Sequence, residues 1–322
     1  MLKIRIFQTK ELTKSTAEAK YGMRLGHFDM NLFVVLDALL DLKSVTKASE
    51  RLCIGASATS SALGRLREHF KDDLLVQIGR RMELTPLAES LREPVRDILL
   101  RSQSTLTSKA AFEPATAQRH FVFNASDYSA TVFLAPLLQR LSRVAPGISL
   151  DIIELGNNNL AKLERGEVDI AIYPERNASP NYPAETLFEE DYVCVAWEKS
   201  RHTGPRISFN DYIAAKHISV RMGEQRIPSF EEWFLSAHGI KRQIVATSST
   251  FNAQPMMILG TEYIATMHRR LAQIYARLLP LRLLTPEFET PGLCLVMQWN
   301  HFNNSDAGHR WLREQLKTIQ PV

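Results

Sequence analysis

Residues 30–89 have the sequence MNLFVVLDALLDLKSVTKASERLCIGASATSSALGRLREHFKDDLLVQIGRRMELTPLAE. Apolar residues recur at i, i+3, i+4 and i+7 near its start, and this spacing predicts a helix with Leu32, Val35, Leu36 and Leu39 on one face. Ser44 can cap a second helix, which Gly55 would end. The inward residues would be Val45, Ala48 and Leu52 in this second helix, and Ala62, Leu63, Leu66 and Phe70 in a third. Three short helices around one apolar core predict a small all-α domain.

The outer side of the third helix carries unusually small residues. At 100° per residue, one face collects Ser57, Ser60, Ser61, Gly64 and Arg65. A solvated helix normally carries Glu, Lys and Gln there, whereas a helix that seats its backbone in the DNA major groove needs little side-chain bulk. We therefore predict a helix-turn-helix with a DNA-reading third helix. The alternative is a Ser-rich surface helix that never meets DNA.

A basic hairpin is predicted directly after the third helix. Gly79, Arg80 and Arg81 stand between short apolar runs in the segment from Leu74 to Thr85. Such an arrangement is typical of a wing, whose arginines would grip phosphate. The charge distribution agrees, because residues 1–110 hold 18 Lys and Arg against 13 Asp and Glu, while the rest of the chain holds 21 against 22. A basic end joined to a neutral body suits a polyanion partner.

Residues 30–89 resemble the LysR-type transcriptional regulators, and most closely their NodD/NahR-like branch, whose members sense aromatic compounds. The likeness continues in EEWFLSAHGIKR at 231–242 and MQWNHFNNSDAGHRWLREQL at 297–316. The resemblance implies a cytoplasmic regulator that binds promoter DNA, assembles from dimers into a homotetramer and contacts RNA polymerase. The expected DNA contacts are Ser44, Thr46, Ser57, Ser60, Ser61, Gly64, Arg65, Arg80 and Arg81.

Two positions depart from the family where it touches DNA. Relatives usually open the recognition helix with a Gln-Pro pair, but this chain has Ala56 and Ser57. Their wing usually carries an Arg where Gln77 stands here. A Gln that reaches a base edge is thus missing, so we expect an altered sequence preference.

The expected organisation is a tail at 1–27, a winged helix-turn-helix at 28–87, a linker helix at 88–114 and an effector-binding domain at 115–322. Apolar residues at helical spacing mark the linker, namely Leu87, Leu91, Val95, Ile98 and Leu106. It is either a helix packed on its own domain or, by resemblance, the helix through which these regulators dimerise. Pro94 predicts a kink or a late start in it.

Beyond Arg119 short apolar strands alternate with amphipathic helices, and the order of the first series predicts a parallel sheet with helices on both faces. The strands of the first series would be Phe121–Phe123, Leu150–Ile153 and Val168–Tyr173, with a helix bearing Val132, Phe133, Leu137, Leu138 and Leu141 between the first two. A second series begins after Tyr192, with a strand at His217–Val220 and a helix opened by a capping box of Ser229 and Glu232. This pattern predicts a two-lobed, Rossmann-like α/β domain of the periplasmic-binding-protein type, with lobe I at about 115–187 and 290–322 and lobe II at about 188–289.

Ligands of open parallel sheets bind beyond the carboxyl ends of the strands. These ends select Ser126, Asp127, Gly156, Asn157, Tyr173, His217, Arg221, Thr250, Phe251, Met267 and His268. The resemblance separately implies effector contacts at Ser126, His217, Phe251 and Met267. Aromatic and sulfur walls with hydroxyls and an imidazole suit a flat phenol, and Arg221 would favour an acid if it pointed inward. The plain alternatives are that Ser126 and Asp127 only cap a helix, that His217 is an ordinary strand-edge histidine, and that Phe251 and Met267 are core residues.

An enzyme is not expected. Ser126, Asp127 and His217 lack a GxSxG elbow, since the nearest string, at 55–59, lacks its last glycine. P-loop, GxGxxG and HExxH patterns are missing, so we expect neither a cofactor nor a metal. Cys53, Cys194 and Cys294 are too few and too far apart for a disulfide framework, and we expect buried thiols. The chain also lacks an apolar run long enough to span a membrane.

Three hypotheses remain from the sequence. The chain is a ligand-responsive DNA-binding regulator, a DNA-binding protein whose α/β domain serves only assembly, or a small-molecule binding protein with decayed DNA contacts. Ala56, Ser57 and Gln77 keep the third hypothesis open.

Overall fold

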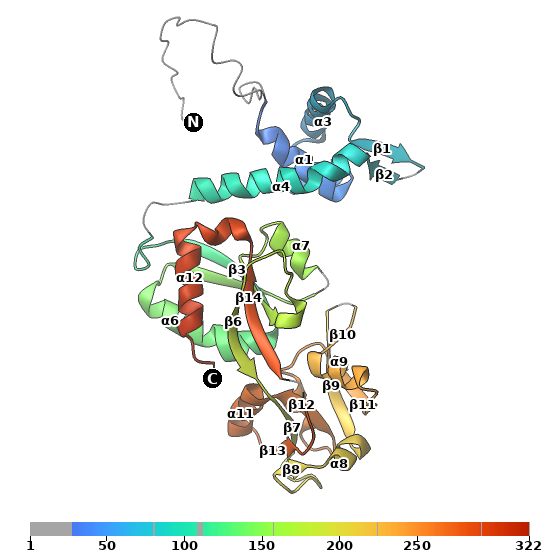
Figure 1. Cartoon of the computed structure of the whole chain (residues 1–322), viewed down its shortest axis with the longest axis vertical. Helices are drawn as coiled ribbons and strands as arrows, with labels where there is room; N and C mark the ends of the chain where they lie inside the picture. Colours follow the sequence, from blue (N-terminus) through green and yellow to red (C-terminus); the bar gives the residue numbers. More distant parts are fainter. Residues whose placement is uncertain are drawn as a thin grey trace, which may run out of the picture. The chain divides into compact units, whose positions relative to one another are not determined.

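The computed structural model describes residues 28–79, 81–107, 112–156, 158–223, 225–290 and 292–321. The expected tail at 1–27, Arg80 and Asn157 lie outside the described residues. The chain divides into two compact units, residues 1–99 and 100–322. Figure 1 shows the helical first unit with its hairpin and the two sheets of the second.

The first unit packs three helices and a hairpin around one core. Its elements are α1 (Asn31–Leu42), α2 (Val45–Leu52), α3 (Ala56–Phe70), β1 (Leu75–Ile78) and β2 (Arg81–Leu84). The predicted stripe of α1 is buried, and Ser44 caps α2 by accepting a hydrogen bond from the Lys47 N–H at 3.3 Å. Gly55 does not end α2 as expected. The helix ends at Leu52 with Cys53 in the left-handed region, while Gly55 is the N-cap of α3.

The linker helix α4 (Pro86–Thr107) begins two residues before its expected start at 88. Thr85 explains this start, because its hydroxyl accepts from the Ala88 N–H at 3.1 Å and Pro86 takes the first helical position, where no N–H is needed. Pro94 lies inside the helix, so the expectation of a late start was wrong. The helix also ends before residue 114.

Lobe I contains a five-stranded sheet in the order β4-β3-β5-β14-β6. The strands are β3 (Arg119–Ala125), β4 (Ile148–Ile153), β5 (Ile170–Pro174), β6 (Ala184–Glu190) and β14 (Leu293–Trp299). The first three are parallel, as predicted, and β14 pairs antiparallel with β5 and β6. The helices are α5 (Asp127–Ser129), α6 (Ala135–Val144), α7 (Asn159–Glu164) and α12 (Ala307–Thr318), with short 3₁₀ turns at Glu175–Asn177 and His301–Asn304.

The predicted helix after β3 is interrupted. A π-helical turn at Ala130–Leu134 separates α5 from α6, and the Ala135 N–H bonds to the carbonyl of Ala130. Pro136 follows and cannot donate to a regular ladder. Leu138, expected on the apolar face, is 51% exposed instead.

Lobe II contains a seven-stranded sheet in the order β10-β9-β12-β7-β13-β8, with β11 also paired to β9. The strands are β7 (Tyr192–Trp197), β8 (Arg206–Ile207), β9 (Lys216–Met222), β10 (Ile227–Pro228), β11 (Gln243–Ser248), β12 (Ile264–His268) and β13 (Leu281–Pro286). The helices are α8 (Phe209–Ala214), α9 (Phe230–Ala237), α10 (Gln254–Ile258) and α11 (Arg269–Leu278). The chain crosses between the lobes twice, from β6 to β7 and from β13 to β14 (Figure 1).

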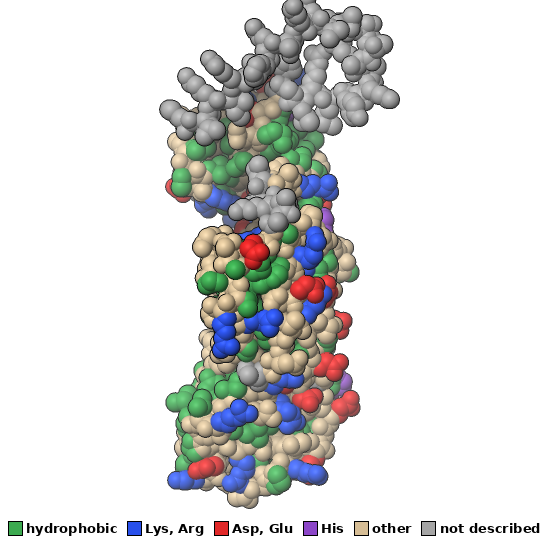
Figure 2. Space-filling view, turned by 90° about the vertical axis from the view of Figure 1, so that its left-hand side faces the viewer, with side chains coloured by type: hydrophobic (Ala, Val, Ile, Leu, Met, Phe, Trp, Pro, Cys, Tyr) green, Lys and Arg blue, Asp and Glu red, His purple; other side chains and the backbone are tan. Residues whose placement is uncertain are grey.

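Figure 2 shows Lys and Arg interspersed with Asp and Glu on one face of the second unit, so charge of one sign does not dominate that face. Cys194 is buried, but Cys53 is exposed, against the expectation of buried thiols. Within the described ranges, no helix is long and apolar enough to cross a membrane, and no three His, Cys, Asp or Glu side chains gather as a metal site.

Candidate DNA-binding face and effector site

The outer face of α3 carries mostly small side chains. Its candidate DNA contacts are all exposed, namely Ser57, Ser60, Ser61, Gly64 and Arg65. The opposite face is buried in the core of the first unit through Ala62, Leu63 and Leu66. A Cβ at Gly64 would meet nothing within 4 Å, so packing within the chain does not require a glycine there. This face allows the helix backbone to approach a groove floor closely.

Two candidate contacts lie at the start of α2, and Arg65 has an intramolecular partner. Ser44 is half-buried and its hydroxyl oxygen caps the helix, while Thr46 is exposed in the first turn. The Arg65 guanidinium lies 3.4 Å from the Asp29 carboxylate. Because the Arg65 side chain is 55% exposed and this pair is long, it can exchange Asp29 for a phosphate at low cost.

The hairpin after α3 has the geometry of a wing. Ile78 pairs with Arg81 across a two-residue turn, where Gly79 has φ +64°. Arg81 is exposed at the tip. Gln77, at the position of the usual arginine, donates its amide N–H to the Gly79 carbonyl at 3.1 Å and so supports the turn.

Arg67 was missed by the sequence reasoning. Its guanidinium donates to the carbonyls of Asp73 and Leu75, both at 2.8 Å, and thereby fixes the wing to α3. The one sequence signal for this role was an arginine placed one turn before the end of the helix.

In lobe I, Ser126 and Asp127 follow β3 but have different roles. Ser126 caps α5, because its hydroxyl accepts from the Ser129 N–H at 3.2 Å. The Asp127 carboxylate reaches lobe II, where it accepts from the N–H groups of Phe251 (3.1 Å) and Asn252 (2.8 Å) and from the Asn252 side-chain amide (2.8 Å). Asp127 therefore does more than cap a helix. We call this set of bonds the interlobe latch.

An aromatic cluster lies beside the interlobe latch. Tyr128 of lobe I stacks on His268 of lobe II with ring centroids 3.8 Å apart, and Phe251 and Tyr192 contact the same imidazole at 4.7 and 5.0 Å. The Tyr128 hydroxyl donates to the buried carboxylate of Glu190, which Arg270 approaches to 3.2 Å. Burial lowers the pKa of His268 to about 3, so this ring is neutral near pH 7.

His217 and Arg221 lie on a different face of lobe II. They alternate on β9 with Ile218 and Val220, which face the main core. His217 is fully buried, and its Nε2 bonds to the Tyr212 carbonyl at 2.7 Å. Its pKa is lowered to about 4, first by burial and then by the charge of Arg242.

Arg221 pairs with the carboxylate of Glu232 at 2.8 Å, and Ser219 donates to the same carboxylate at 2.6 Å. Glu232 thus does not complete the capping box predicted with Ser229, whose oxygen still accepts from the Glu232 N–H at 3.4 Å. The inward-pointing, unpaired Arg221 that would favour an acid is not found.

The other candidate effector residues are spread over the domain. Gly156 lies at the boundary, since a Cβ on Gly223 of lobe II would be 3.7 Å from its Cα. Thr250 is half-buried beside Phe251. Met267 is buried in the main core, and Tyr173 is buried in the smaller core beside α7, where its hydroxyl donates to Gln298. The structure therefore brings together Ser126, Asp127, Thr250 and Phe251, and leaves Tyr173, His217 and Arg221 apart.

Asn252, Tyr128 and Glu190 also lie at the boundary but were not selected as site residues, whereas His268 was selected at the end of its strand. Asn252 followed Phe251 directly, and Tyr128 followed Asp127, so the sequence signal was proximity alone. His268 is 4% exposed, so its ring is buried at this boundary.

Comparisons with known proteins agree with this architecture. The family model of the LysR substrate binding domain matches residues 114–320, and that of the bacterial regulatory helix-turn-helix protein, lysR family, matches 30–89. Nodulation protein D 2 of Rhizobium tropici is 39% identical over 294 residues, covering 91% of this chain and 93% of the relative. Nodulation protein D 1 of Bradyrhizobium diazoefficiens is 35% identical, covering 91% and 94%. The crystal structure of a probable transcriptional regulator from Pseudomonas aeruginosa has a TM-score of 0.63 at 30% identity, covering 92% and 99%.

A winged helix-turn-helix joined to a two-lobed α/β domain defines a class of DNA-binding regulators that sense small molecules. The chain belongs to the LysR family of transcriptional regulators.

Proposed function

We propose that this regulator responds to a neutral aromatic or phenolic effector that binds at the boundary of the two lobes. The observation that carries the proposal is the interlobe latch. The Asp127 carboxylate already occupies the backbone N–H groups of Phe251 and Asn252, where the carboxylate of an acidic effector would otherwise bind.

The charge of Arg221 supports the same ligand class. Glu232 neutralises it at 2.8 Å, so it offers no unpaired cation to an acid. Ser126 and Thr250 supply hydroxyls and Phe251 an aromatic ring beside the latch. A flat ring with a hydroxyl group matches this combination, since aromatic walls and a few polar groups are what such ligands need.

The remaining parts of the proposal concern assembly and output. Helices α4 of two chains pair, dimers associate into tetramers, and the α3 helices enter successive major grooves of promoter DNA in the cytoplasm. Effector binding changes the packing of the lobes and thereby the contact with RNA polymerase. The protein acts through binding alone and is not an enzyme.

Footprinting on the DNA upstream of the gene, with and without a panel of phenols and benzoates, tests this function. We expect protection that weakens steeply with salt, because phosphate contacts release counterions, and a footprint that shifts with a phenol but not with its benzoate. Protection that no aromatic compound changes would leave assembly as the role of the α/β domain. Without salt-sensitive protection, the chain would be a small-molecule binding protein that no longer binds DNA.

A further inference from the structure

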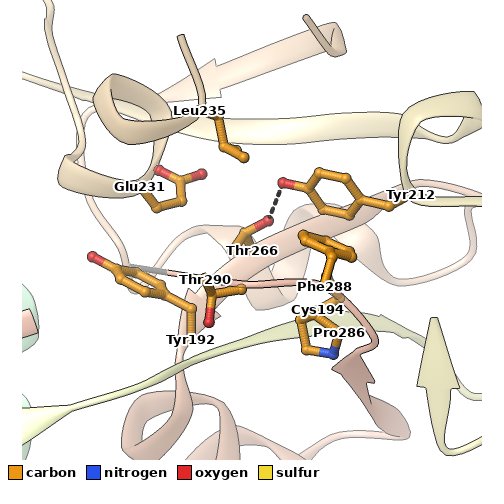
Figure 3. A pocket seen from close by; sticks show the side chains of 9 residues that line it. All are labelled: Tyr192, Cys194, Tyr212, Glu231, Leu235, Thr266, Pro286, Phe288 and Thr290. Atoms are coloured by element: carbon orange, nitrogen blue, oxygen red, sulfur yellow. Dashed lines mark hydrogen bonds between the residues drawn. The ribbon is translucent and has the colours of Figure 1, made fainter. Parts of the chain in front are cut away.

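The cavity inside lobe II is too small to hold an effector (Figure 3). Its free volume is about 10 Å³, which is the room of one water molecule. Polar groups in its wall are already bonded within the chain, because the Tyr212 hydroxyl lies 2.9 Å from the Thr266 hydroxyl and a buried arginine donates to the Glu231 carboxylate at 3.0 Å. The feature with a further role lies in the first unit instead.

The turn at residues 71–74, which joins α3 to the wing, has a strained backbone. Lys71 has φ +52° and Leu74 has φ +57°, in the left-handed region that residues with a Cβ rarely adopt. Leu74 is also buried in the core of the first unit, so the turn cannot relax without moving a core residue. Strained backbone of this kind persists only where surrounding contacts hold it, and it is frequent at functional sites.

Arg67 holds the turn where the chain enters the wing. Its Nε donates to the Asp73 carbonyl and its Nη2 to the Leu75 carbonyl, both at 2.8 Å, so one edge of the guanidinium spans the turn. A guanidinium presents these two donors in a fixed planar geometry, whereas a lysine ammonium is a single donor atom on a flexible stem. The contact therefore fixes the direction in which β1 leaves α3, as well as its distance from the helix.

The base of the wing is also held where the chain leaves it. The Asp72 carboxylate accepts from the Leu74 N–H at 2.7 Å and from the Thr85 hydroxyl at 2.6 Å. Lys43, at the end of α1, forms an ion pair of 2.6 Å with Glu83 of β2. Because these contacts gather at its base, the wing projects from the three-helix core at a fixed angle.

We propose that Arg67 is a positioning residue for DNA binding, whose guanidinium sets the angle at which Arg81 meets a phosphate while α3 lies in the major groove. Among the described residues of β1, β2 and their turn, Arg81 is the one cation, and it is exposed. Its phosphate contact depends on the angle of the wing, because phosphate contacts fix a protein on the duplex only where the charges meet. This inference rests on the proposed placement of α3 on DNA.

Arg67→Lys tests the proposal, because lysine keeps the charge but cannot bridge the two carbonyls. Fluorescence anisotropy with labelled upstream DNA at several salt concentrations measures the affinity and its salt dependence. We expect severalfold weaker binding and a slope of log affinity against log salt that is shallower by at least about one, as in Arg81→Ala, because a phosphate contact is lost. If Arg67 itself bound a phosphate, lysine would replace it and the slope would not change.

Two further measurements separate positioning from a general loss of structure. In hydroxyl-radical footprints, Arg67→Lys should lose the backbone positions that Arg81→Ala loses and keep the others, whereas an unfolded domain would lose all of them. Arg51→Lys is the matched control, since Arg51 contacts the Asp41 carboxylate at 2.7 Å through one nitrogen, which lysine can replace. It should bind DNA like the wild-type protein.

The double variant Arg67→Lys with Arg81→Ala decides whether the first residue acts through the second. We expect it to lose less affinity than the product of the two single factors, because both changes remove the same contact. Factors that multiply, or an Arg67→Lys protein that binds like the wild type while Arg81→Ala flattens the salt slope, would overturn the positioning role and leave the proposed function standing. Wild-type affinity that does not depend on salt would refute the proposed function, and this inference with it.

Discussion

His268 links ionisation to stability at a single residue. Its pKa is lowered by burial from 6.5 to about 3, so the folded chain keeps the ring neutral while the unfolded chain protonates it below pH 6.5. The unfolded state therefore binds more protons in this window, and the stabilising contribution present above pH 6.5 is lost as the pH falls toward 3.

We predict that His268→Phe makes the protein less sensitive to acid. The ring still packs against Tyr128, and among the described residues Nδ1 of His268 has no partner to lose. Each such proton contributes up to about 1.4 kcal/mol per pH unit to the slope of the unfolding free energy. Urea unfolding at several pH values between 4.5 and 7.5 measures that slope. His217 and His309 have pKa values lowered to about 4, so their contributions to the slope should remain in the variant. An unchanged slope in His268→Phe would show that the ring is not buried as described.

The residue scale also shows where sequence reasoning fails. Arg221 lies near the carboxyl end of β9 as predicted, but His217 lies at the amino end of that strand, and the face they share depends on which side α8 and α9 cover. Periodicity of two assigns alternate residues to opposite faces without saying which face meets the ligand. The Asp127 latch joins residues 124 and 125 positions apart, a juxtaposition that no local pattern encodes.

At the scale of elements, prediction from the sequence was far better. The apolar stripes of α1 and α3 and the capping residues Ser44 and Ser229 were found because periodicity and capping are local. The breaks in regularity were not found, since the π-helical turn at Ala130–Leu134 looks like any amphipathic helix in sequence. Regular helices and strands follow from local sequence patterns, whereas irregular turns within a helix depend on tertiary packing.

Helix α3 allows a test that separates folding from DNA contact. Gly64 lies exposed in the helix interior, and a Cβ there would meet nothing within 4 Å. Gly64→Ala should therefore stabilise the first unit by about 0.5–1 kcal/mol through helix propensity. It should also weaken DNA binding severalfold, because the methyl group holds the backbone away from the groove, and Gly64→Gln should weaken it more.

Thermal unfolding and fluorescence anisotropy with labelled upstream DNA measure the two effects. The gain in stability is the internal control, because misfolding cannot explain weaker DNA binding by a domain that has become more stable. Full DNA affinity in both variants would mean that this face of α3 does not contact DNA.

At the scale of the whole molecule, the interlobe latch ties the two lobes of the second unit together. Three donors from lobe II hold one carboxylate of lobe I, and the stacked pair of Tyr128 and His268 lies beside them. Hydrogen bonds to a charged group are stronger than neutral ones, so the carboxylate carries much of the coupling between the lobes. The effector proposed for the boundary would act by shifting this balance, because a ligand moves an equilibrium only by its difference in affinity for the two states.

Asp127→Asn should consequently mimic part of the effector response. The amide keeps the size of the carboxylate but turns one acceptor into a donor that faces the N–H groups of Phe251 and Asn252, so we expect a loss of about 1.5–3 kcal/mol in the unfolding free energy of the second unit. Backbone amides around Phe251 should exchange hydrogen faster, and the ligand-free footprint should move toward that of the effector-bound protein. Asp151→Asn, at an exposed position on β4, is the matched control. If Asp127→Asn loosens the amides yet leaves the footprint unchanged, the interlobe latch stabilises the fold without transmitting the signal, and the coupling must run through the crossings instead.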